Sequence, residues 1–165
     1  PLTIGLIFIL LYTAFNSVRY ATLIIANVPF AAIGGIFSLF VSGQYLSVPA
    51  AVGFIAVFGV AMLNGIVLIS FLNGLREQGL NIRETVVQGA VLRLRPVLMT
   101  ALVEILGLLP FLLATGVGSE VLRPLATVVV GGLISSTALT LFILPLVYEW
   151  MEQRRQSQHL EGAIQ

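Results

Sequence analysis

Long apolar runs alternate with short polar segments along the whole chain, and this alternation predicts its architecture. A helix needs roughly 20 consecutive apolar residues to cross the hydrocarbon core of a bilayer. Five runs meet or approach that length, at residues 2–15, 20–42, 49–72, 96–114 and 124–149. We therefore predict an all-α, polytopic transmembrane helix bundle over residues 1–150, with a polar cytoplasmic tail at 151–165.

The first run is shorter than the others and does not start with Met. We expect it to be the remnant of a longer helix, and the polypeptide to be the C-terminal piece of something larger. No charged segment followed by a short apolar stretch and a small-residue cleavage site opens the chain, so a signal peptide does not explain the run.

Composition supports a membrane protein and excludes several classes of function. The chain is 58% hydrophobic and only 9% charged, with a net charge of +1. That charge offers no basic patch for nucleic acid, and the absence of cysteine excludes disulfides and thiolate ligands. The GxSxG, GxxxxGK[ST] and HExxH signatures are also missing. We predict no enzymatic activity, no cofactor and no metal site in this segment.

The arginines predict how the bundle lies in the membrane. Short loops rich in Arg or Lys stay on the cytoplasmic side. If the first run leads into the cytoplasm, only Arg123 of the 8 basic residues lies outside. The C-terminus is then cytoplasmic, and Tyr148 and Trp150 are expected in the aromatic belt at the inner interface.

The longest inner connection has a helical pattern of its own. In the segment 81–92, apolar residues recur at every fourth position, namely Ile82, Val86 and Ala90. This spacing predicts a short amphipathic helix lying on the inner membrane surface. Asn81 is placed to cap its N-terminus, and Glu84 three residues later completes a capping box.

An acidic residue lies inside the fourth apolar run. If that helix begins near Pro96, a favourable first helical position, Glu104 lies about 12 Å along it, close to the bilayer midplane. Thr100 precedes Glu104 by one turn, and Arg93 shares their face if the helix extends back beyond the proline. Ionisable residues within a membrane span are functional candidates. Glu104 either handles protons or cations, or is a protonated side chain that hydrogen-bonds a neighbouring helix.

Other residues within the runs indicate close packing between helices. Asn64 can bridge helices or orient a buried charge through its amide. Gly132, Ser136 and Thr140 recur every four residues, forming a narrow stripe that lets a neighbouring backbone approach. Pro29, Pro110 and Pro145 are expected to kink helices or mark local irregularities. All of these features suit a bundle of packed spans.

Three segments in combination resemble the last membrane spans of the resistance-nodulation-division (RND) transporters. They are residues 51–72 (AVGFIAVFGVAMLNGIVLISFL), 93–102 (RLRPVLMTAL) and 118–126 (GSEVLRPLA). The likeness covers essentially the whole chain and points to the heavy-metal-efflux branch, typified by cobalt-zinc-cadmium resistance pumps. It implies transmembrane helices 8 to 12 of a bacterial inner-membrane pump that exchanges divalent metal ions for protons. Such pumps work as homotrimers with a periplasmic adaptor and an outer-membrane channel.

The resemblance also implies roles for particular residues. Arg93 and Thr100 fall on the family's positions for a relay arginine and threonine. Leu63, which precedes Asn64, falls where many drug exporters carry a lysine, and this argues against the multidrug branch. Glu104 matches no relay position of the family and is a feature of this sequence. A multidrug RND permease, and a non-transport membrane scaffold or translocation helper, are the alternatives.

Overall fold

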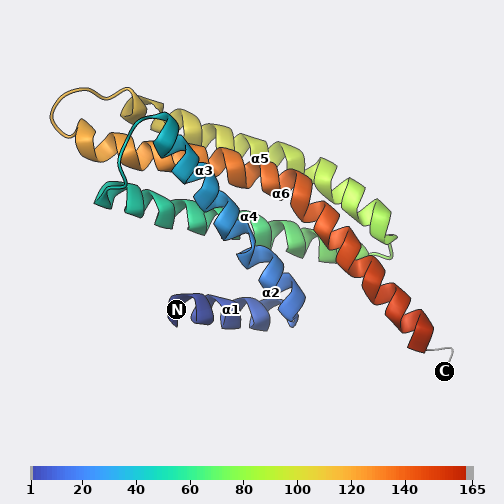
Figure 1. Ribbon diagram of the computed structural model, residues 1–165. Coiled ribbons are helices and arrows are strands. Elements are labelled where there is room, and N and C mark those ends of the chain that lie inside the picture. The colour runs from blue at the N-terminus through green and yellow to red at the C-terminus, as the bar shows by residue number, and fades with distance from the viewer. Residues whose placement is uncertain (1, 163–165) are drawn as a thin grey trace.

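The chain folds into helices joined by short connections (Figure 1). The computed structural model describes residues 2–162, with side-chain surroundings up to residue 155. All regular structure in that range is α-helical, as predicted. The helices are α1 (Leu2–Phe15), α2 (Val18–Ile25), α3 (Asn27–Val41), α4 (Val48–Glu77), α5 (Ile82–Leu112) and α6 (Ser119–Gly162).

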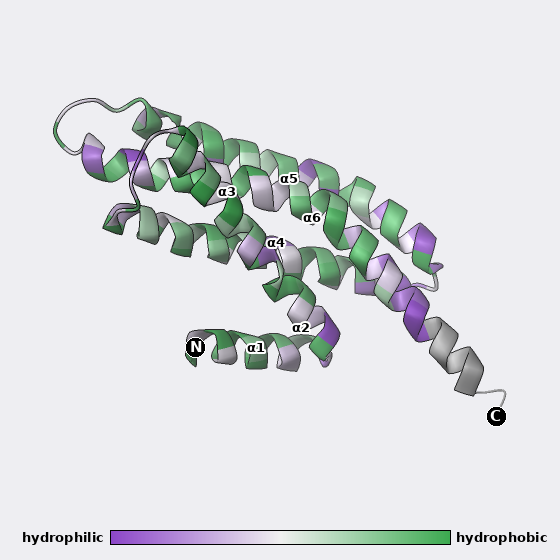
Figure 2. Ribbon diagram, viewed as in Figure 1, coloured by the Kyte–Doolittle hydropathy of each residue, from purple (hydrophilic) through white to green (hydrophobic). Residues whose placement is uncertain are grey.

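Four stretches of helix are long and apolar enough to cross a membrane. They are Val18–Val41, which comprises α2 and α3, then Val48–Glu77, Ile82–Leu112 and Ser119–Arg155. Helix α1 has only 14 residues, fewer than the roughly 20 that a span needs. Figure 2 shows a hydrophobic middle section, with hydrophilic residues gathered toward the ends of the helices. The structure thus provides four of the five expected spans at full length.

The second expected span is interrupted at its centre. Helix α2 ends at Ile25, and α3 begins two residues later. Pro29 has no N–H to donate to the carbonyl of Ile25, and its ring crowds that carbonyl. Because the N–H of Ala26 still bonds the carbonyl of Thr22 at 2.9 Å, the interruption is a local irregularity rather than a loop. The irregularity expected of Pro29 is present, whereas α5 and α6 continue as helix through Pro110 and Pro145.

Helix α5 corrects the boundary expected near Pro96. We predicted a surface helix over 81–92 and a separate span from about residue 96, but one helix runs from Ile82 to Leu112. The first turns of α5 pack against other helices. Val86 belongs to a buried hydrophobic cluster, and Gly89 lies against Leu72 of α4. Buried residues on both sides of Pro96 hold the helix together although one hydrogen bond is lost.

The start of α5 keeps the predicted cap. Asn81 is the N-cap residue, and its backbone N–H donates to the carboxylate of Glu84 at 3.3 Å. This capping box sets where the helix begins, directly after the turn that follows α4.

Helix α6 extends well beyond the expected span at 124–149. It starts at Ser119 and continues to Gly162, so most of the expected polar tail is helical. The side chains of Gln153 and Glu149, one turn apart, are hydrogen-bonded at 3.0 Å, which supports the helix after its apolar part ends. Residues 163–165 of the tail lie outside the described residues.

Helices α3 and α6 approach each other through glycines. A Cβ atom on Gly131 would overlap the side chain of Ser38 and lie 2.7 Å from the carbonyl oxygen of Gly34. The small-residue stripe of the sequence is buried as well, with Ser136 and Thr140 fully inaccessible. Such close approach is how helices associate where lipid removes the hydrophobic driving force.

Candidate functional site

Arg93 lies on α5 and turns toward α4. Its guanidinium carbon is 4.4 Å from the centre of the Phe71 ring, a distance that gives a cation–π attraction. The Nε atom is buried and has no hydrogen-bond partner within the described part of the chain. Buried N–H groups are normally paired. Arg93 therefore holds a positive charge and an unused donor at the contact between the two helices.

Thr100 and Glu104 follow Arg93 along the same side of α5. Because α5 is continuous through Arg93, the spacings of seven and four residues bring the three positions within about 40° of one another around the helix. Thr100 is exposed, and its hydroxyl donates to the carbonyl of Val97 at 2.9 Å. Glu104 is half-buried. The common face expected from the sequence is therefore present.

Asn64 lies on α4, two turns before the ring that contacts Arg93. It precedes Phe71 by seven residues, so both side chains leave the same side of the helix, and Phe71 is the ring beneath Arg93. Asn64 is half-buried, whereas Leu63 is 61% exposed. The spacing therefore puts Asn64 near the side of α4 from which Phe71 meets Arg93. The interhelical bridge expected of Asn64 is not formed with the described residues.

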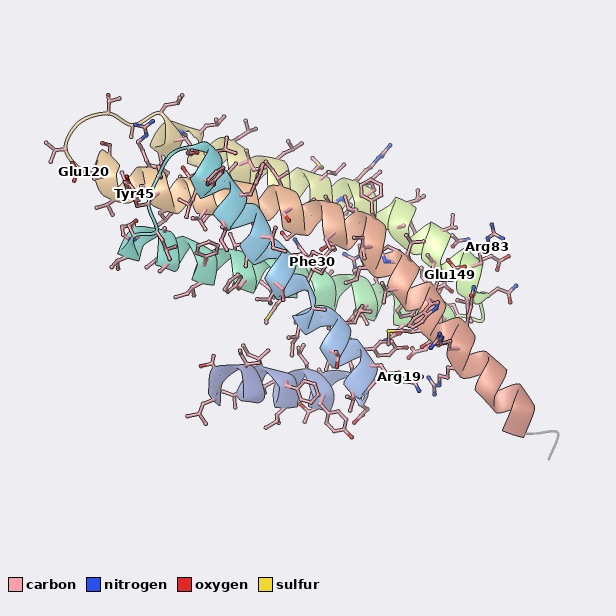
Figure 3. The ribbon with its side chains drawn as sticks, in the orientation of Figure 1. Arg19, Phe30, Tyr45, Arg83, Glu120 and Glu149 are labelled. Atoms are coloured by element: carbon pink, nitrogen blue, oxygen red, sulfur yellow. The ribbon has the colours of Figure 1, made fainter. Side chains whose placement is uncertain are left out.

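The outer side of α5 is uncovered. Helix α5 buries only six of its 31 residues, and large apolar side chains next to Thr100 and Glu104 are exposed, namely Met99, Leu102, Val103 and Leu106. In Figure 3 side chains stand out along the outer edge of this helix. The candidate residues thus lie beside a surface that these helices leave open.

The candidate residues of the α5 face are an arginine, a threonine and a glutamate. Within the described residues, no three His, Cys, Asp or Glu side chains come together as a metal site would require. An arginine, a threonine and a carboxylate on one helix face can instead carry charge and exchange protons.

Sequence reasoning missed the most buried amide of the bundle. Asn27 starts α3 and is inaccessible to solvent. Its Nδ2 atom donates to the carbonyl of Ala61 at 3.1 Å and to the hydroxyl of Thr140 at 3.0 Å. The residue therefore joins α3, α4 and α6. Its position two residues before Pro29, inside an apolar run, was the available signal.

A second missed feature is a polar network at the end of the bundle where α2 begins. Glu152 of α6 is buried, forms an ion pair with Arg76 of α4 and accepts a hydrogen bond from the Tyr20 hydroxyl at 2.6 Å. The ring of Tyr20 stacks on Tyr148, with centroids 5.7 Å apart, and the Tyr148 hydroxyl donates to Asn73 at 2.7 Å. The network compensates a buried carboxylate and ties three helices together.

Tyr148 corrects another expectation. We predicted it in the aromatic belt beside Trp150, but its side chain is fully buried, and only Trp150 is exposed. A buried tyrosine needs a partner for its hydroxyl, and Asn73 on α4 provides one.

The sequence matches a known family along most of its length. A model of the AcrB/AcrD/AcrF family covers residues 1–152. The chain is 53% identical to the cobalt-zinc-cadmium resistance protein CzcA of Cupriavidus metallidurans, across 90% of this chain and 14% of that protein. It is 44% identical to the cation efflux system protein CusA of Escherichia coli K12, across 94% of this chain and 16% of that protein.

The fold is likewise similar to a solved structure. A crystal structure of a heavy metal efflux pump superimposes with a TM-score of 0.83 and 51% sequence identity. That match covers 93% of this chain and 15% of the pump. The chain thus spans about one seventh of the length of these relatives.

Proposed function

Because the chain belongs to the AcrB/AcrD/AcrF family, we propose that it forms the C-terminal membrane part of a proton-driven efflux transporter for divalent heavy-metal ions. The observation that carries this proposal is the 53% identity to a cobalt-zinc-cadmium resistance protein across 90% of the chain. The chain accounts for only 14% of that relative, so the substrate ions and most of their path belong to the complete transporter.

Proton antiport is the coupling that we assign to the α5 face. Arg93, Thr100 and Glu104 share that face, and Arg93 keeps a buried donor without a partner among the described residues. The uncovered outer side of α5 suits a second set of spans that would bring carboxylates to this face. In this proposal Arg93 and Thr100 form part of the proton relay, and Asn64 orients the seam between α4 and α5.

The proposed setting is the bacterial inner membrane. The five helical segments correspond to spans 8 to 12 of the transporter, with α1 as the inner part of the eighth. Arg19, Arg83 and Arg154 then lie on the cytoplasmic side together with the C-terminus. The complete pump is a homotrimer that works with a periplasmic adaptor and an outer-membrane channel.

Growth in metal tests the proposed function. We expect the complete gene that encodes this segment to restore zinc, cobalt or cadmium tolerance to a host without its own metal pumps. The same gene with an in-frame deletion of α5 serves as the inactive control. Tolerance to organic compounds without tolerance to metals would favour the multidrug alternative, which Leu63 argues against. Normal membrane insertion without either tolerance would favour a scaffold.

A second expected result concerns Glu104. The amide of Glu104→Gln keeps the size of the side chain but cannot release a proton, so proton uptake coupled to metal export should fall about tenfold or more. The measurement is the pH change in vesicles that contain the complete transporter after addition of zinc. Glu120→Gln, at an exposed carboxylate that begins α6, is the matched control. Unchanged export and coupling in Glu104→Gln would assign Glu104 to packing alone.

A further inference from the structure

A groove separate from the α5 face lies between α6 and the helices α2 and α3. Its volume is about 680 Å³, within the range of roughly 300–1,000 Å³ that is usual for ligand pockets. Most of its length is apolar, with Leu23, Phe30, Leu139, Ile143 and Val147 among the lining side chains. This surface suits a hydrocarbon chain.

One end of the groove is positively charged. Arg19 of α2 and Arg154 of α6 both line it, both side chains are exposed, and the lining includes no acidic residue. The guanidinium of Arg154 lies 4.0 Å from the centre of the Trp150 ring, which also lines the groove. In Figure 3, Arg19 lies near the start of α2, and Phe30 lies farther along toward the middle of the bundle. The groove therefore has a cationic mouth and an apolar body.

The nearest buried acid does not neutralise this mouth. Glu152 precedes Arg154 by two residues, so its side chain leaves a different side of α6. Its carboxylate is already engaged by Arg76 and by the Tyr20 hydroxyl. Neither Arg19 nor Arg154 forms an ion pair with a carboxylate of the described residues. Their charge is available to an external anion.

We propose that this groove binds one anionic phospholipid, whose phosphate contacts Arg19 and Arg154 and whose acyl chain lies along the apolar lining. Guanidinium groups match phosphate oxygens with paired hydrogen bonds. Basic pockets between transmembrane helices on the cytoplasmic side are suited to anionic head groups, and tryptophan prefers the same level of the membrane. The inference requires only that the bundle lies in the membrane with these arginines inside. It does not depend on metal transport.

Lipid binding to the complete transporter provides the test. We would purify it in detergent and measure retention of phosphatidylglycerol and of phosphatidylcholine with the same acyl chains by native mass spectrometry. The double variant Arg19→Gln/Arg154→Gln should bind phosphatidylglycerol about 30-fold more weakly. The matched control Arg83→Gln/Arg95→Gln, which removes two exposed arginines outside the groove, should bind as the parent does.

A second variant tests the apolar part without changing charge. Ile143→Trp would fill the body of the groove and should also weaken retention of phosphatidylglycerol. Equal losses in the two arginine pairs would mean a general effect of surface charge and would overturn the proposal. Equal retention of both lipids, or no retained lipid in the parent because another segment of the transporter covers the groove, would overturn it as well.

Discussion

Replacing Arg93 by alanine in the complete transporter is expected to abolish metal tolerance. The substitution removes a positive charge at the contact between α4 and α5, together with its unused donor. A guanidinium stays protonated in proteins, so Arg93 would act on the relay through its fixed charge and donor. Removal of one such donor lowers rates by about 10²–10³-fold, so the rate of metal-driven proton uptake should fall by at least about 100-fold. The measurements are zinc tolerance in cells and proton uptake in vesicles, at matched protein levels in the membrane.

Two variants separate the charge of Arg93 from its packing. Arg95→Ala removes an exposed arginine two residues away and should leave transport intact. Phe71→Leu removes the ring beneath the guanidinium but keeps the charge, so it should retain most of the activity. If Phe71→Leu were as inactive as Arg93→Ala, the arginine would act by holding α4 and α5 together rather than through its charge in the relay.

Replacing Gly131 by leucine is expected to disrupt the bundle. Any side chain at this position meets Ser38 and the backbone of Gly34, so α3 and α6 must separate. Overpacking lowers the free energy of unfolding by about 1–3 kcal/mol where neighbouring side chains can shift. Because the new side chain meets backbone here, we expect a loss at or above the upper end of that range. The expected result is a lower melting temperature of the complete transporter, measured by size-exclusion chromatography after heating in detergent.

Gly74→Leu is the matched control for that substitution. A Cβ atom on Gly74 meets no atom within 4 Å. Leucine also favours helix more than glycine, which is about 0.8–1 kcal/mol less favourable than alanine. Its melting temperature should stay equal to that of the parent or rise. A fall as large as that of Gly131→Leu would show that any leucine in these helices is harmful, and that the contact between α3 and α6 is not special.

The spans could be predicted from sequence because a charge in hydrocarbon is expensive. Uncharged runs of sufficient length therefore marked four of the helices. The boundary at Pro96 was wrong because proline rules are local. They describe the lost hydrogen bond, of the order of 3 kcal/mol in a helix interior, but not the burial of Val86, Val97 and Ala101 on either side. Tertiary packing of this kind overrides a local preference.

The candidate site was partly predictable for a related reason. The common face of Arg93, Thr100 and Glu104 follows from helical periodicity alone. The hydrogen bonds of Asn27 join residues 34 and 113 positions apart, and the ion pair of Glu152 joins residues 76 positions apart. Periodicity within one helix contains no information about such pairs. Only the arrangement of the helices brings those partners together.

The glycine contact between α3 and α6 has a mechanical consequence. Two backbones that touch at Gly34 and Gly131 cannot slide past each other by one residue, a shift of about 1.5 Å, without a collision of side chain with backbone. We therefore expect helices α3 and α6 to move together. Helix α5 buries six of its 31 residues, against nine of 30 in α4, so a larger share of its surface is free of the rest of the bundle. A proton gained or lost on the α5 face would act on a helix that is able to tilt or shift against the joined pair.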